Sequence, residues 1–413
     1  MVQLSFTLLP AILLAVRVAA GPVLVNESPI TLDISRHFNF TGGSVVQSDL
    51  ARINAFKNRS IMKNGLNARD FISETVVNRV VDYIATVGVG SPATSYDLLV
   101  DTGSSNTWIG AGKNYVVTST STQTSSRVSV VYGSGSFSGT EYTDQVTLAP
   151  GLVIPKQSIG VASRSSGFSG IDGILGLGPV GLTAGTLSPD PASLIPTVMD
   201  NLVSQGTITN NIFGISFQPT TTAKDANGSI AFGGIDRTKF TGEIAYTPVT
   251  STFPASEYWG IDQEVTYGTT SILASTAGIV DTGSTLIHLA TDGFNRYQGA
   301  TGGVLDANTG LLRITATQYA ALQNLNFIIG ASFRGVTYAL TPNAQIWPRS
   351  LNTAIGGSAR SIYLIVADSR SNSGEGFDFI NGYAFLERFY SVHDTDNNRI
   401  GFATTPFTSA TTN

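Results

Sequence analysis

The 413-residue chain contains no cysteine, so neither a disulfide nor a site that depends on a thiolate can form. Charged residues make up 12 %, about half of the ~25 % usual in soluble proteins. Only three histidines are present, which argues against a histidine-rich metal site. Residues 71–413 hold 16 basic and 24 acidic residues, and this balance argues against nucleic acid as a partner. We expect no cofactor and no metal.

Long apolar runs are scarce except at the N-terminus. A stretch from Leu4 to Val16 is followed by small residues before Gly21, which predicts a secretory signal peptide over residues 1–20. No basic residue precedes the stretch and Arg17 follows it, so a short membrane anchor is the alternative. No other segment has the ~18 uninterrupted apolar residues that a membrane span needs. We therefore expect a soluble, secreted, extracellular protein without a membrane partner, stabilised by a large core.

Residues 21–70 differ in charge from the rest, with six basic and four acidic side chains. One interpretation is a polar extension. We favour a removable propeptide whose cations cover a carboxylate site until acid releases them, with the activation cut between Asn64 and Glu74. Candidate N-glycosylation sites have the Asn-x-Ser/Thr pattern and are Asn26, Asn39, Asn58 and Asn227.

The rest of the chain has the composition of a β protein. Forty-four glycines, with many serines and threonines, separate short runs such as VDYIATVGVG, VSVVYGSG and IFGISF. This pattern predicts a mainly antiparallel, all-β fold. Two short helices are expected: PTVMDNLVSQG, with Pro196 in its first turn, and TQYAALQNL, with Tyr319 and Leu322 on one face.

An internal repeat organises the chain. The block VDTGS occurs at residues 100–104 and again at 280–284, and each copy is followed later by a similar tripeptide, Ile-Leu-Gly at 174–176 and Ile-Asn-Gly at 380–382. The repeat predicts two related β lobes that divide near residues 245–260.

Each repeat places an aspartate directly after apolar strand residues. A single Asp-Thr-Gly is adequately explained as a turn, but two copies in matching contexts are not. Related lobes would bring Asp101 and Asp281 face to face, with Gly103 and Gly283 allowing a close backbone approach. Two carboxylates at ~3 Å share one proton, so one would act as general base and the other as general acid.

Further motifs agree with this arrangement in order and spacing. They are VYGSGSFSGT at 131–140, IDGILGLG at 171–178, YWGI at 258–261 and FINGYAFLERFYSVHDTDNNRIGFA at 379–403. On these motifs residues 81–403 resemble the pepsin-like aspartic proteases, and look closest to secreted fungal enzymes of the polyporopepsin type. The resemblance implies an all-β, bilobal acid-protease fold: signal peptide 1–20, propeptide 21–70, N-terminal lobe 71–250 and C-terminal lobe 251–413.

The resemblance also implies the activity and the roles of individual residues. Asp101 and Asp281 would activate a water molecule for peptide hydrolysis at acidic pH. Ser104 and Ser284 would hydrogen-bond the outer carboxylate oxygens, and Thr102 and Thr282 would support the turns from inside the lobes. Expected partners are protein or peptide substrates, pepstatin-type inhibitors and the chain's own propeptide, and a monomer is expected.

Residues of a flap and an apolar pocket follow from the same resemblance. Tyr132, Gly133 and Ser134 would form a flap over the substrate, with Trp108 holding the Tyr132 hydroxyl. The pocket for the residue before the cut would be lined by Leu99, Phe168, Ile171 and Ile174, which implies a preference for large apolar or aromatic side chains. Outside this context, Trp108 and Tyr132 would be interpreted as ordinary core residues.

The chain departs from the family pattern at two points. The usual disulfides are absent, and the common Ile-Leu-Gly-Asp sequence is replaced by Ile380-Asn381-Gly382-Tyr383. Asn381 and Tyr383 therefore leave open how the second DTGS turn is supported and over which pH range the protein works.

Other functions fit the sequence less well. Two glycine-rich segments that could suggest a nucleotide site are interrupted by Pro92 and Pro179. Only His288 and His393 lie outside residues 1–70, and neither has the surroundings of a serine-hydrolase triad. A glycosidase needs carboxylates ~5 to 9 Å apart, whereas the repeat favours closer contact. The remaining alternative is an inactive, protease-like module that binds peptides or inhibitors.

Overall fold

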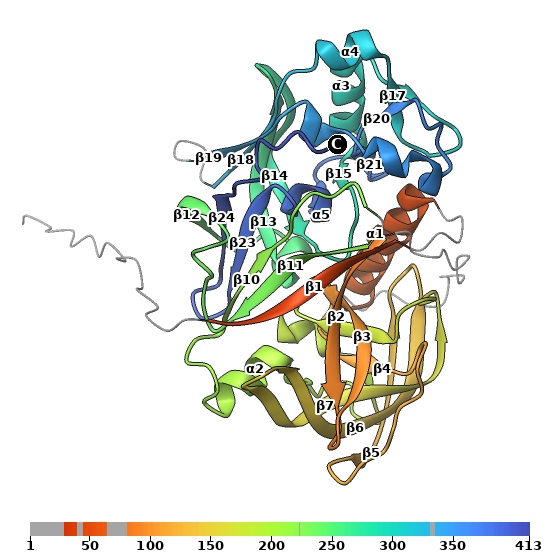
Figure 1. Ribbon diagram of the computed structural model, residues 1–413, viewed down its shortest axis with the longest axis vertical. Helices are drawn as coiled ribbons and strands as arrows, with labels where there is room; N and C mark the ends of the chain where they lie inside the picture. Colours follow the sequence, from red (N-terminus) through yellow and green to blue (C-terminus); the bar gives the residue numbers. More distant parts are fainter. Residues whose placement is uncertain (1–28, 39–43, 64–80, 223, 331–334) are drawn as a thin grey trace, which may run out of the picture.

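The computed structural model describes residues 29–38, 44–63, 81–222, 224–330 and 335–413. The predicted signal peptide, the candidate sites Asn26 and Asn39 and the expected activation cut lie outside these residues. The described chain forms two β lobes, and α1 (Val45–Lys63) lies between them (Figure 1). The predicted all-β fold is confirmed.

The largest sheet has 14 strands and includes strands from both ends of the described chain. In spatial order they are β12 (Thr241–Pro248), β24 (Arg399–Thr404), β23 (Phe389–Asp394), β10 (Ile212–Ser216), β11 (Lys224–Phe232), β1 (Ile30–Phe38), β2 (Val81–Val89), β3 (Thr94–Asp101), β8 (Gly173–Gly176), β4 (Trp108–Ile109), β7 (Leu152–Ser166), β6 (Ser136–Ala149), β5 (Thr122–Val131) and β9 (Leu187–Ser188). The C-terminal strands β23 and β24 thus pair with β10 and β12, which precede residue 250.

Two smaller sheets build the second lobe. The seven-stranded sheet has the order β19 (Val336–Leu340), β18 (Leu325–Ile329), β13 (Gly260–Tyr267), β14 (Thr270–Val280), β22 (Phe379–Asn381), β15 (Ile287–Leu289) and β21 (Val366–Asp368). The three-stranded sheet has the order β16 (Val304–Leu305), β17 (Leu312–Ile314) and β20 (Ile362–Tyr363). The expected boundary near residue 250 falls between β12 and β13.

Helices are short apart from α1. The others are α2 (Val198–Ser204), α3 (Thr291–Thr301), α4 (Ala316–Ala320) and α5 (Tyr383–Leu386). The two expected helices are present as α2 and α4, with small corrections. Pro196 precedes the N-cap Thr197, because the Thr197 hydroxyl accepts from the Asp200 N–H and starts the helix there, and Leu322 lies beyond α4.

The helices α1 and α3 were not predicted. For α1 a signal was present, since Val46, Leu50 and Ile53 stand at helical spacing (i, i+4, i+7). The basic composition of residues 21–70, here called the leader, drew attention to their charge and away from this helical spacing. In the structure Val46 and Ile53 are buried against the lobes, so contact with the rest of the chain stabilises the helix.

Each strand that leads into a DTGS turn pairs with the strand that contains the later tripeptide of the same repeat. β3 runs parallel to β8, with Asp101 opposite Gly176, and β14 runs parallel to β22, with Val280 opposite Asn381. On the other side of the tripeptide strand, each lobe has a further short strand that pairs antiparallel with it: β4 with β8, and β15 with β22. The same local topology therefore presents both aspartates at strand ends.

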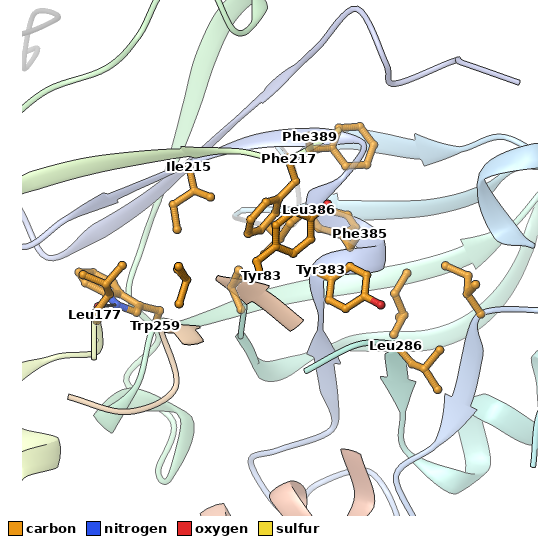
Figure 2. Close-up of a cluster of buried hydrophobic side chains, with 14 of the residues drawn as sticks. Tyr83, Leu177, Ile215, Phe217, Trp259, Leu286, Tyr383, Phe385, Leu386 and Phe389 are labelled. Atoms are coloured by element: carbon orange, nitrogen blue, oxygen red, sulfur yellow. Dashed lines mark hydrogen bonds between the residues drawn. The ribbon is translucent and has the colours of Figure 1, made fainter. Parts of the chain in front are cut away.

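One hydrophobic core extends through both lobes (Figure 2). It includes Tyr83 of β2, Phe217 directly after β10 and Phe385 of α5. The indole N–H of Trp259 donates to the carbonyl of Leu177 at 2.9 Å, which links the two lobes by a buried hydrogen bond. In a chain without disulfides, this continuous core supplies the cohesion between the lobes.

Candidate active site

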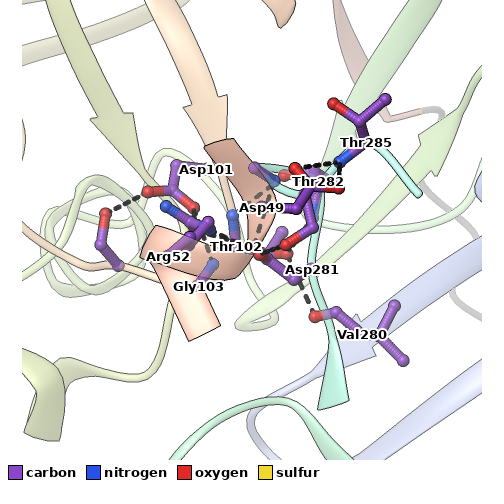
Figure 3. Close-up of polar contacts among 12 residues, drawn as sticks. Asp49, Arg52, Asp101, Thr102, Gly103, Val280, Asp281, Thr282 and Thr285 are labelled. Atoms are coloured by element: carbon purple, nitrogen blue, oxygen red, sulfur yellow. Dashed lines mark hydrogen bonds and ion pairs between the residues drawn. The ribbon is translucent and has the colours of Figure 1, made fainter. Parts of the chain in front are cut away.

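The two DTGS turns, one from each half of the internal repeat, lie against each other (Figure 3). The backbone N–H of Thr102 donates to the Thr282 hydroxyl, and that of Thr282 donates to the Thr102 hydroxyl, both at 3.0 Å. The Thr282 hydroxyl donates onward to the carbonyl of Val100 at 2.9 Å. Thr102 and Thr282, expected to support the turns from inside the lobes, therefore do so through contacts that cross between the lobes. The near-symmetry of the turns makes this exchange possible.

The glycines permit the close approach that the repeat predicted. A Cβ atom on Gly103 would stand 2.5 Å from Asp281 Oδ1, and one on Gly283 would stand 2.8 Å from Asp101 Oδ1. Neither position has room for a side chain, so each turn requires glycine for the opposite aspartate to fit.

Both carboxylates are fully buried and are held by donors from their own turns. Ser104 Oγ donates to Asp101 Oδ2 at 2.5 Å, and Ser284 Oγ donates to Asp281 Oδ2 at 2.6 Å. The Gly103 N–H reaches Asp101 Oδ1 at 2.9 Å, and the Gly283 N–H reaches Asp281 Oδ1 at 3.1 Å. The two sites have matching hydrogen-bond patterns, which fix the orientation of each carboxylate.

A leader residue that the sequence analysis did not single out occupies this site. Arg52 of α1 donates from Nε to Asp281 Oδ2 at 2.6 Å and from Nη2 to Asp281 Oδ1 at 2.9 Å. The same Nη2 also contacts Asp101 Oδ1. Arg52 is 2 % exposed, so its guanidinium is buried between the two carboxylates. The hypothesis of a cation-covered carboxylate site predicted this class of contact but not its residue.

The electrostatics of the site follow from this contact. Burial raises the pKa of Asp281, but the Arg52 charge and hydrogen bonds, with those of Ser284 and Gly283, outweigh it and leave the pKa lowered. Burial lowers the pKa of Arg52, yet the two aspartates raise it overall, so Arg52 stays charged. While α1 is in place, Asp281 is therefore held as an ionised partner of Arg52.

A carboxylate of α1 enters the same region as Arg52. Asp49 accepts the backbone N–H of Thr285 at 3.1 Å and that of Leu286 at 2.9 Å, directly after the second DTGS turn. Its Oδ2 also lies 3.0 Å from Nε2 of His288. Asp49 and Arg52 are three residues apart and thus point from one face of the helix into the second lobe's turn.

The predicted flap is a turn between β5 and β6. The Tyr132 N–H donates to the carbonyl of Gly135 at 2.8 Å and closes the turn, with Gly133 at a positive φ of 75°. A Cβ atom on Gly133 would lie 1.9 Å from the carbonyl oxygen of Ala51. The flap therefore rests directly on α1, and its adjacent Ser134 is buried.

The expected pocket residues lie together. Leu99, Phe168, Ile171 and Ile174 form one buried cluster with Trp108 and Tyr132. Trp108 and the Tyr132 hydroxyl, the pair expected to hydrogen-bond, are both buried, and a hydrogen bond with Trp108 acts to lower the pKa of Tyr132. The two rings lie at 24° to each other with centroids 6.4 Å apart, and Phe137 stacks on Trp108 with centroids 4.2 Å apart. Burial, followed by the Asp101 charge, raises the pKa of Tyr132.

The two residues that differ from the family's Ile-Leu-Gly-Asp sequence, Asn381 and Tyr383, are both accommodated locally. Asn381 donates to Gln263 Oε1 at 2.8 Å and accepts from Gln263 Nε2 at 3.3 Å, so a reciprocal amide pair is buried beneath the second turn. The Asn381 carbonyl accepts the Asp281 N–H at 3.2 Å. Tyr383 is buried beside Tyr83, with ring centroids 5.5 Å apart.

The remaining candidates are less prominent in the structure. Asn58 is half-buried on α1, whereas Asn227 is buried and its Nδ2, the atom that would carry a glycan, donates to the carbonyl of Gln218 at 2.5 Å. In the described part of the chain, no group of three or more histidine, aspartate or glutamate side chains could hold a metal ion. The described helices are all too short or too polar to cross a membrane.

Comparisons with known proteins agree with this site. A family model described as eukaryotic aspartyl protease matches residues 82–405. Polyporopepsin of Irpex lacteus is 66 % identical over 83 % of this chain and 99 % of the relative, and gastricsin of Cavia porcellus is 30 % identical over 78 % and 80 %. The solved structure of an aspartic proteinase from Irpex lacteus matches with a TM-score of 0.78 and 67 % identity, over 80 % of this chain and 96 % of that one.

Proposed function

Because this chain belongs to the eukaryotic aspartyl protease family and is an aspartic-type endopeptidase, we propose that it is secreted as a zymogen that acid activates. In this state α1 and β1 of the leader block the catalytic pair Asp101 and Asp281. The observation that carries the proposal is the buried guanidinium of Arg52, which hydrogen-bonds both aspartates. Secretion is supported by the signal-peptide pattern of residues 1–20.

Removal of α1 changes the chemistry of the pair. In the leader-bound chain Arg52 Nη2 donates to Oδ1 of both aspartates. Without Arg52, two neighbouring buried carboxylates do not both ionise readily, so we infer that they share one proton, as in pepsin. The ionised member takes a proton from a water molecule that attacks the peptide carbonyl. The protonated member gives its proton to the carbonyl oxygen, which yields a tetrahedral diol. The member that took the proton from water then gives it to the amide nitrogen, while a hydroxyl of the diol returns its proton to the other aspartate, and the C–N bond breaks to release an amine and a carboxylic acid. The Ser104 and Ser284 hydroxyls keep the outer oxygens engaged during these steps.

The surroundings of the pair favour peptide segments with large apolar side chains. The cluster of Leu99, Ile171 and Ile174 beside the flap is apolar and buried. The flap, whose glycine-flanked tip now contacts Ala51, would instead close over a bound peptide and exclude water. We therefore propose a preference for large apolar or aromatic residues around the cut.

The test is proteolysis of casein by the purified full-length protein across pH 2 to 8, before and after incubation in acid. The expected result is cleavage with an acid optimum, a mass loss of roughly fifty residues, inhibition by pepstatin and no cleavage by Asp101→Asn. Processed protein that is folded but cleaves nothing at any pH would overturn the proposal. That outcome would favour a peptide-binding module without catalysis.

A further inference from the structure

The Asp49 carboxylate lies in a site that the catalytic mechanism does not use. Its two oxygens accept from the backbone N–H groups of Thr285 and Leu286, and Oδ2 contacts His288 Nε2. Asp49 is 3 % exposed and His288 is fully buried. Three donors on one carboxylate, in a region shielded from water, form a strong anion site.

This site is built by residues of the second lobe and faces α1, which lies between the lobes. All three donors come from residues 285–288, which follow the second DTGS turn, and the imidazole is placed by β15. The Ser284 hydroxyl, one residue before the site, holds the catalytic Asp281. Asp49 reaches the donors from α1, the element that also carries Arg52 to the catalytic pair. A ligand that lies in the cleft in place of α1 therefore reaches the same donors from the same side.

The donor set has a preference that a purely apolar subsite lacks. The Nδ1 atom of His288 has no hydrogen-bond partner among the described residues. When Asp49 leaves, two backbone N–H groups and an imidazole lose their partner and become open to water. A peptide that covers them again excludes this water, and a donor left unpaired beneath it is costly. An apolar or amide side chain would leave part of this set unsatisfied, whereas a carboxylate satisfies all of it.

We propose that Thr285, Leu286 and His288 form a carboxylate-binding subsite of the mature enzyme, which selects an aspartate or glutamate side chain of the peptide substrate. In the leader-bound chain Asp49 occupies this subsite as a substitute for that side chain. The proposal rests on the proposed function, because it requires that the leader departs and that a peptide takes its place. It adds an acidic residue at one substrate position to the apolar preference around the cut.

The first test uses the processed, unmodified protein at about pH 5, where aspartate side chains are ionised. Matched peptide substrates carry either Asp or Asn at each of the four positions on either side of one apolar cut. We expect the Asp peptide to exceed the Asn peptide by about tenfold in kcat/KM at a single position, a ratio typical of one charged hydrogen-bonded contact. In His288→Leu this Asp/Asn ratio falls toward 1, while in His393→Phe, the matched control at the other buried histidine of the body, it stays at the wild-type value.

A ratio of 1 or less at every position, with the Asn peptides cleaved normally, would overturn the proposal. A second measurement separates its failure from failure of the proposed function. Synthetic peptides of residues 44–59 with Asp49 or with Asp49→Asn are titrated calorimetrically into processed protein, a readout that needs no catalysis. About tenfold tighter binding of the Asp49 peptide, lost in His288→Leu, supports the subsite even in a protein that cleaves nothing. Equal binding of the two peptides counts against it.

Discussion

Single residues decide whether this active site is open or closed. The guanidinium of Arg52 has no counterpart in the repeat, yet it contacts both members of the repeated pair. The planar guanidinium has several N–H donors in fixed directions, so it can hydrogen-bond two carboxylates at once. The ammonium group of a lysine is less suited to this geometry. The lowered pKa of Asp281 means that acid must protonate a stabilised carboxylate before the contact fails.

Arg52→Gln should raise the pH at which the leader is released. The leader contact is strong above the pKa of the free carboxylate and is lost as the pH falls through the lowered pKa of Asp281. Removing the cation leaves two buried carboxylates unpaired, which costs the leader-bound state about 3 to 5 kcal/mol. Casein cleavage after incubation at stepped pH values measures the threshold.

Lys57→Gln on the same helix is the control, because its ion pair with Glu375 lies at the surface. An unchanged threshold in Arg52→Gln would contradict the assigned role.

Glu141 gives the first lobe a pH dependence of its own. Burial raises the pKa of Glu141 to about 7, although the Ser158 hydroxyl donates to it. A raised pKa stabilises the folded state below the unfolded pKa, and this contribution is lost as the pH rises through about 7. The unfolding free energy should therefore fall by about 3 kcal/mol between pH 4 and 7.

Glu141→Gln should remove most of this fall, since an amide stays neutral throughout. Thermal unfolding of both proteins at pH 4, 5.5 and 7 gives the difference. Glu243→Gln, at an exposed position on β12, is the control and should follow the wild type. A variant that loses stability with rising pH as steeply as the wild type would contradict the prediction.

At the scale of elements, two leader segments hold the inactive state together. Arg52 lies on α1, whereas β1 is inserted between β11 and β2 and pairs antiparallel with both. Arg36 of β1 forms a buried ion pair with Glu387 at 3.2 Å, and the Tyr83 hydroxyl donates to the same carboxylate at 2.9 Å. Leaving this sheet exposes two strand edges and a buried acid, so the segment is held much more firmly than a surface tail.

A cut between α1 and β2 should therefore not release the leader at neutral pH. The expected observation is two fragments on a denaturing gel that elute as one species in size-exclusion chromatography at pH 7 and separate at pH 3. Arg36→Gln should shift the separation to higher pH, because Glu387 then lacks its cation. Immediate dissociation of the cut wild-type protein at pH 7 would show that β1 contributes little.

At the scale of the whole molecule, a buried histidine at the contact between the lobes lowers the stability of the folded state in acid. His393 of β23 is fully buried, stacks on Phe213 at 4.6 Å and lies edge-on to Trp259 at 5.0 Å. Burial lowers its pKa to about 3, so the residue is neutral in the folded state over most of the acid range. A depressed histidine pKa contributes stability above about pH 6.5 that is lost as the pH falls toward 3.

His393→Phe should therefore be stabilised relative to the wild type at pH 3 but not at pH 7, by up to about 5 kcal/mol. A phenyl ring keeps the stacking and cannot be protonated. Chemical denaturation of processed protein at the two pH values, with Asp101→Asn in both proteins to prevent self-digestion, gives the comparison. An equal effect of the substitution at both pH values would show that packing, and not protonation, is responsible.

The sequence by itself determined the β fold, the repeat and the paired aspartates. Two VDTGS blocks, each preceded by an apolar strand and followed later by a similar tripeptide, are patterns that the sequence states directly. The parallel pairing of each strand with the strand of its own tripeptide was seen only in the structure. The glycines of the turns were predictable, because the close approach of two backbones admits no side chain. Such features depend on residue type and spacing, which the sequence states directly.

Only the tertiary structure decided which leader residues reach the site. Nothing in the charge pattern distinguishes Arg52 from Lys57 or Arg59, because the choice depends on which face of α1 the cleft covers. The exchange between Thr102 and Thr282, the Asn381–Gln263 pair and the Asp49–His288 contact join residues far apart in the chain. These contacts depend on how the two lobes, the strands within a lobe and the leader pack against one another, so no local pattern in the sequence specifies them.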